Sequence, residues 1–253
     1  DTYERVIAAL KAGQAYYPAL HQALLDGGYG PLSPLNWRTP VFLTVLPWFP
    51  SLATAQRVLG ALTAAGWALT VAFVYRRGGM SFAIWAGVVM ALSLIAIGAP
   101  RAELSFELCA GTLILISVSA YGLGWRLAGV AAGIAALFVR ELAVIYVAVC
   151  LGLAIRERRW REAIAWGVGL VGYALFYLWH WSQIAALLGP ADHAAATGWL
   201  QFGGLEFVLR TAGFNGLLLV ALEWVAAIAL LLGLVGLKSV PRAAVTVALY
   251  LLL

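Results

Sequence analysis

Long apolar runs alternate with short polar or basic turns along most of the 253-residue chain. A helix needs about 20 apolar residues to cross the ~30 Å hydrocarbon core of a bilayer. The pattern therefore predicts an all-α, polytopic helical membrane protein that forms a single membrane domain. Its expected membrane helices cover residues 52–75, 81–98, 106–123, 127–139, 142–155, 163–181, 216–237 and 241–253.

The first 50 residues have a different pattern and form no predicted span. Tyr3, Val6, Ile7 and Leu10 recur at helical spacing, and Asp1 stands where a helix N-cap is expected, so we predict an amphipathic surface helix there. A second such helix is expected at residues 19–25. The apolar run at residues 41–49 is too short to cross a bilayer.

Basic residues indicate which turns face the cytoplasm, because short cytoplasmic loops are enriched in Lys and Arg. The tightest clusters are Arg76, Arg77, Arg126, Arg156, Arg158, Arg159, Arg161, Lys238 and Arg242, which we place inside. Counting apolar runs between these clusters puts residues 1–50, 100–104 and 182–215 outside. The juxtamembrane helices and the long loop at 182–215 are therefore expected on the outer face.

The stretch 127–155 is apolar except for Arg140 and Glu141 near its middle. Both of its flanks are basic, so two short helices that meet at Arg140–Glu141 fit the charge rule. Each half is about 20 Å long, which places the break in a protein-lined cavity below the outer surface. One continuous helix is the alternative.

Composition supports a membrane protein and excludes other classes. Hydrophobic residues make up 64% of the chain and charged residues only 11%, whereas soluble domains carry about 25% charged residues. The net charge of +5 needs no nucleic-acid partner, because cytoplasmic loops account for it. Cys109 and Cys150 lie in apolar runs and indicate no disulfide framework. The chain starts at Asp1 without a methionine and ends in an apolar run, so further spans are expected before residue 1 and beyond residue 253.

Three acidic or ionic groups converge on the predicted outer side. They are Asp1 with Glu4, Glu103 with Glu107, and Arg140 with Glu141. Carboxylates beside a cation in a partly dry cavity suit transfer from a phosphorylated substrate, with a base for the acceptor and a cation for the leaving phosphate.

Each group also has a structural interpretation. Asp1 is a natural helix cap, and Glu103 and Glu107 suit the start of a helix, where the dipole favours carboxylates. Arg38 either binds phosphate or extends along the interface. His180, between Trp179 and Trp181, fits an interfacial aromatic belt better than a catalytic role, and His21 is expected to be an exposed residue of an outer loop.

The order of these groups resembles the membrane glycosyltransferases of the GT-C superfamily, such as protein mannosyltransferases and aminoarabinose transferases. The resemblance covers most of residues 1–162. In that superfamily an acidic residue precedes juxtamembrane helices, an Arg or His precedes two prolines, a second acidic residue opens the fourth span, and a basic residue splits an apolar helix pair. The matching residues here are Asp1 with Tyr3 and Glu4, Arg38-Thr39-Pro40 with one proline lost, Glu107, and Arg140-Glu141.

The resemblance implies an inverting transfer of a sugar from a polyprenyl-phosphate carrier to a lipid, glycan or protein acceptor, at the periplasmic face of a bacterial inner membrane. Asp1 and Glu107 would be catalytic, and the expected substrate-binding residues are Tyr3, Glu4, Arg38, Arg140 and Glu141. A divalent cation at Glu107 and Glu103 is compatible with it. The expected partners are membrane lipids, the polyprenyl-linked sugar and, in some settings, another membrane-complex subunit. The rival interpretation is a noncatalytic subunit of a membrane complex, or a lipid or ion transporter.

Overall fold

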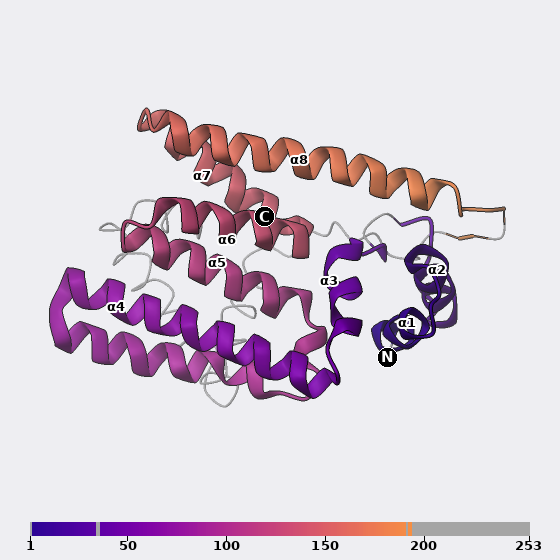
Figure 1. Ribbon diagram of the computed structural model, residues 1–253, viewed down its shortest axis with the longest axis horizontal. Coiled ribbons are helices and arrows are strands. Elements are labelled where there is room, and N and C mark those ends of the chain that lie inside the picture. Colours follow the sequence, from indigo (N-terminus) through magenta and orange to yellow (C-terminus); the bar gives the residue numbers. More distant parts are fainter. Residues whose placement is uncertain (1, 34–35, 191, 194–253) are drawn as a thin grey trace, which may run out of the picture.

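The computed structural model describes residues 2–33, 36–190 and 192–193, and within these residues it contains only helices, turns and loops (Figure 1). The all-α prediction is confirmed for this part of the chain. The predicted helices at 216–237 and 241–253, and most of the outer loop at 182–215, lie outside the described residues. By length and composition alone, two described helical segments, Leu52–Val88 and Trp160–Ala185, are long and apolar enough to cross a membrane, and the first contains the chain reversal at Gly79.

The N-terminal helices form a small layer beside the main bundle. Helix α1 (Thr2–Lys11), α2 (Tyr16–Asp26), α3 (Pro40–Val45) and the short η2 (Leu46–Trp48) share one core. Val6 and Ile7, the apolar face of α1, are buried against Leu20 and Leu43. The amphipathic helix is therefore present, but other helices of the protein cover the centre of its apolar face.

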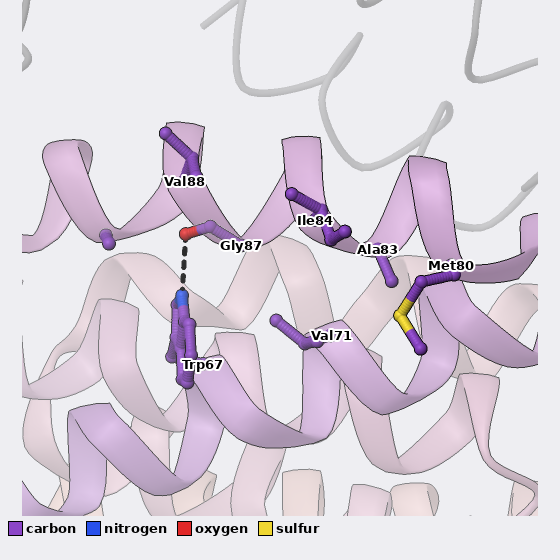
Figure 2. A pocket seen from close by; sticks show the side chains of 8 residues that line it. Trp67, Val71, Met80, Ala83, Ile84, Gly87 and Val88 are labelled. Carbon is purple, nitrogen blue, oxygen red and sulfur yellow. Dashed lines mark hydrogen bonds between the residues drawn. The ribbon is translucent and has the colours of Figure 1, made fainter.

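Helix α4 (Leu52–Ser93) consists of two antiparallel arms, because Gly79 adopts φ 80° and ψ −173° and reverses the chain. Only glycine adopts this conformation at low cost. Figure 2 shows the arms side by side: the Trp67 indole N–H donates to the Gly87 carbonyl at 2.8 Å, near Val71. The reversal falls between the predicted helices 52–75 and 81–98.

The rest of the bundle follows in chain order. It comprises η3 (Leu94–Gly98), η4 (Ala102–Leu104), α5 (Phe106–Gly122), α6 (Arg126–Val139), η5 (Glu141–Ala143), α7 (Val144–Arg156) and α8 (Trp160–Ala185). Figure 1 shows that the α4 reversal and the α5–α6 and α7–α8 turns lie at one end of the bundle, while α3 and the α6–α7 junction lie toward the other. We call these the basic end, which carries Arg76, Arg77, Arg126 and the cluster at 156–161, and the α3 end.

The core of the bundle is built where small residues let helices approach. A Cβ added at Gly133 of α6 would lie 2.5 Å from the Trp166 ring and 2.9 Å from Tyr146. Trp166 and Tyr146 are almost fully buried, and the Trp166 indole donates to the Tyr121 hydroxyl at 2.8 Å. Glycine at position 133 thus sets how closely α6 packs against α7 and α8.

Two histidines tie the N-terminal layer to α8 and to the residues that follow it. His180 is only 1% exposed; its Nδ1 lies 3.0 Å from the Tyr17 hydroxyl and its Nε2 3.3 Å from the Trp37 carbonyl. His21 lies within α2, stacks on Trp37, and pairs with Asp192 at 2.9 Å. The prediction of an exposed loop position for His21 was therefore wrong, because His21 lies on α2 and packs against Trp37 and Asp192. The interfacial position of His180 stays a prediction, and its ring is buried against Tyr17 and Trp37.

Candidate functional site

The predicted site residues meet at the α3 end of the bundle, and Arg38 lies near the centre. Arg38 comes two residues before α3, where Pro40 occupies the first turn and holds Thr39 extended. The Arg38 carbonyl accepts a hydrogen bond from the Tyr16 hydroxyl at 2.7 Å, and Thr39 Oγ1 donates to the Phe138 carbonyl at 3.1 Å. The backbone around Arg38 is thus fixed to both α2 and α6.

Arg140 and Glu141 occupy the break between α6 and α7. Arg140 is extended, with φ −140° and ψ 118°, and the short helix η5 starts at Glu141. A helix end leaves its last carbonyl groups without intrahelical partners, and Thr39 satisfies the one at Phe138. The predicted break thus coincides with a real interruption, and one carbonyl group of the helix end, that of Phe138, is bonded to the residue after Arg38.

Glu107 approaches from the first turn of α5. Ser105 caps this helix by accepting from the Leu108 N–H at 3.2 Å, and its hydroxyl donates to Glu107 Oε2 at 3.3 Å. The Glu107 Oε1 atom lies 3.1 Å from Arg140 Nη2. Glu107 therefore has the structural role expected at a helix start and also contacts the Arg140 guanidinium.

Glu141 bridges the two arginines. Its Oε1 atom accepts from Arg38 Nη1 at 2.9 Å and from Arg140 Nη1 at 2.8 Å. The side chains of Arg38, Arg140 and Glu141 are 9%, 11% and 16% exposed, whereas that of Glu107 is 60% exposed. Two cations and two carboxylates thus form one network, and Glu107 is its solvent-accessible member.

The network contains buried atoms that the described residues leave without a hydrogen-bond partner. These are Glu141 Oε2 and Arg140 Nε. Most buried polar atoms in proteins have a partner, so such atoms mark a place where a further polar group is accommodated. The guanidinium of Arg140 therefore retains donor capacity toward a bound anion.

Aromatic groups surround Arg38. The Tyr3 hydroxyl of α1 accepts from Arg38 Nε at 3.2 Å, and the Arg38 Cζ atom lies 5.6 Å from the centroid of the Phe106 ring. Burial by itself lowers the pKa of Arg38, but Tyr3 and the carboxylates of Glu141 and Glu107 together raise it above its ordinary value. Arg38 is therefore a permanent cation, as an anion-binding role requires.

The remaining predicted residues lie around this network. Glu4 forms an ion pair with Arg101 at 2.9 Å, which joins α1 to the loop before η4. Glu103 is buried and lines a separate apolar cleft. Asp1 lies outside the described residues, so its role as a base stays a prediction.

A metal site also stays a prediction. Within the described residues, no group of three or more His, Cys, Asp and Glu side chains is arranged to hold a metal ion. Glu107 already forms an ion pair with Arg140 and accepts a hydrogen bond from Ser105, so a metal cation there would compete with Arg140.

Sequence reasoning gave no role of their own to three residues of the site, although Thr39 stands within the Arg38-Thr39-Pro40 motif. Tyr16 positions the Arg38 backbone, burial raises the pKa of Tyr16 well above its usual value, and the neutral phenol therefore remains a donor. Thr39 donates a hydrogen bond to α6. The Phe106 ring lies against the Arg38 guanidinium. Only Thr39 carried a signal, as the residue before a proline at a helix start. The other two contacts join residues far apart in the chain.

The comparisons add no family assignment: no protein-family model, no curated protein and no solved structure significantly matches this chain.

Proposed function

We propose that the protein is an inverting, GT-C-type membrane glycosyltransferase that moves a sugar from a polyprenyl-phosphate carrier to an acceptor at the outer face of the membrane. The supporting observation is the meeting of two mostly buried guanidinium groups, Arg38 and Arg140, at a helix break beside the acidic start of α5. Ionisable residues at such a depth in a membrane protein usually mark a substrate site.

The arrangement of the ends of the bundle agrees with this proposal. The clustered basic turns lie at the end opposite α3, so the positive-inside rule places them in the cytoplasm and the arginine network outside. The polytopic topology, the inner-membrane location and the periplasmic orientation are parts of the proposal.

The network suggests how a lipid phosphate would enter. Glu141 is mostly buried between the two arginines, while Glu107 is exposed and holds Arg140 through one contact. An incoming phosphate would replace Glu107 at Arg140, because bidentate Arg–phosphate pairing is strong and the exposed Glu107 contact is weak. Glu107 would then be free to contact the acceptor or a divalent cation.

In the proposed reaction the acceptor oxygen attacks the anomeric carbon while the bond from that carbon to the phosphate oxygen breaks. The acceptor proton passes to Asp1, and Arg38 and Arg140 neutralise the negative charge that develops on the departing phosphate. Glu141 and Tyr3 hold the two guanidinium groups in position.

Asp1→Asn tests the proposed base. Asn preserves the size and capping ability of Asp but accepts no proton, so we expect sugar transfer to fall by about 100- to 10,000-fold with donor binding retained. The assay is transfer from polyprenyl-phosphate sugars in liposomes, with thermal unfolding measured alongside. The matched control is Asp26→Asn, at an exposed aspartate of α2 that pairs with Arg5. A folded Asp1→Asn protein with normal turnover would leave Asp1 as a cap only, and binding without any transfer by the unmodified protein would favour a noncatalytic subunit.

A further inference from the structure

An apolar cleft of about 300 Å³ lies between the α3–η2 segment and the first turns of α4. Phe42 and Leu46 line one side, Val58 and Leu62 line the other, and among the described residues Glu103 is the one carboxylate in the lining. The α4 residues that line it, 55–62, cover about 10 Å of helix at 1.5 Å per residue. The cleft therefore has the size and polarity for part of one alkyl chain.

Glu103 is an unusual residue to find in this lining. It is only 6% exposed, and within the described part of the chain its Oε2 atom is buried without a hydrogen-bond partner. Leaving a carboxylate oxygen buried and unpaired is costly, and such a group in a native protein calls for a compensating ligand.

The position of Glu103 is fixed by its backbone. The Leu104 N–H donates to the Arg101 carbonyl at 3.0 Å, and the Gln56 amide donates to the Ala99 carbonyl at 2.9 Å, which ties this loop to α4. Nearby cations have other carboxylate partners: Arg101 pairs with Glu4, and Arg140 with Glu107 and Glu141. The loop thus holds the carboxylate at the cleft.

We propose that this cleft binds a membrane amphiphile that carries a primary ammonium group. The apolar chain lies between α3 and α4, and the ammonium donates a hydrogen bond to Glu103 Oε2. A buried carboxylate with a free acceptor complements a cationic donor and repels an anionic head group. The site is therefore distinct from the one proposed for the lipid phosphate at Arg38 and Arg140, and it does not depend on sugar transfer.

Three probes with the same 12-carbon chain test the chemistry: dodecylammonium, dodecyltrimethylammonium and dodecanoate. Native mass spectrometry of the intact protein in a nonionic detergent measures the affinity of each probe. We expect dodecylammonium to bind as a single copy and at least tenfold more tightly than the other two, because only it both carries a positive charge and donates N–H hydrogen bonds.

Single-residue variants test whether the amine binds in this cleft. Glu103→Gln should weaken dodecylammonium binding at least tenfold, whereas Glu157→Gln, a control at an exposed glutamate at the basic end, should leave it unchanged. Val58→Trp, at a partly exposed residue of the cleft, should block all chains even if Glu103→Gln fails to fold. Equal dodecylammonium binding by folded Glu103→Gln and unmodified protein, or equal binding of the ammonium and trimethylammonium probes, would overturn the proposal.

The source of the amine is tested in nanodiscs of ethanolamine or choline phospholipids. Selective retention of the ethanolamine lipid after solubilisation, lost in Glu103→Gln, identifies a head group as the ligand. Binding of the free amine alone identifies a smaller amphiphile. Both results support an ammonium site, and binding of neither amine contradicts it.

Discussion

Glu141 and Glu107 contact the same arginine, yet their surroundings give them different energetic roles. Glu141 is mostly buried and bridges Arg38 and Arg140, while Glu107 is 60% exposed and has one ion-pair partner in the described part of the chain. Removing one partner of a buried ion pair leaves an uncompensated charge, whereas an exposed pair contributes little. Replacing each carboxylate in turn therefore compares the stability contributed by a mostly buried ion pair with that of an exposed one.

We expect Glu141→Gln to lower the free energy of unfolding by about 3–5 kcal/mol, and Glu107→Gln by about 0–1 kcal/mol. Denaturant unfolding in detergent micelles measures both. Each change removes one charge and keeps the side-chain size, so the two variants control for each other. Equal losses would show that the arginines do not depend on Glu141.

At the scale of elements, the positions of the basic residues predicted the helix break at Arg140–Glu141, which the pattern of apolar residues alone did not. The break at Arg140–Glu141 followed from two basic flanks around one apolar stretch, and α6 ends at Val139 as expected. The pairing of Arg38 with Glu141 could not be predicted, because it joins residues 103 apart and depends on how α3 packs against α6. The covering of the apolar face of α1 likewise depends on tertiary packing.

Helix packing gives a second test. Gly133→Ala places a methyl group against the buried Trp166 ring, so we expect a clear drop in the unfolding temperature, with α6 displaced from α7 and α8. Gly152→Ala is the matched control, because an added Cβ there meets no atom within 4 Å and alanine favours helix. If both variants unfold at the same temperature, the close approach at Gly133 does not stabilise the bundle.

At the scale of the whole molecule, the proposal requires the basic end and the α3 end to face opposite sides of the membrane. Ala99 and Arg161 are exposed residues at these two ends, whereas Ala102 is too buried to label. In a background without Cys109 and Cys150, an impermeant maleimide on right-side-out vesicles should label Ala99→Cys but not Arg161→Cys. A permeant maleimide should label both. Labelling of both by the impermeant reagent would refute the topology.

The most direct measurement of the central claim is the affinity of the protein for polyprenyl phosphate in detergent or nanodiscs. A charge-assisted hydrogen bond contributes about 1.5–3 kcal/mol, so Arg140→Gln should weaken binding about 10- to 100-fold. Arg57→Gln, an exposed arginine of α4 that bonds within its own helix, should bind like the unmodified protein. Equal affinity of a folded Arg140→Gln variant, or no binding by the unmodified protein, would contradict a lipid-phosphate site at Arg38 and Arg140.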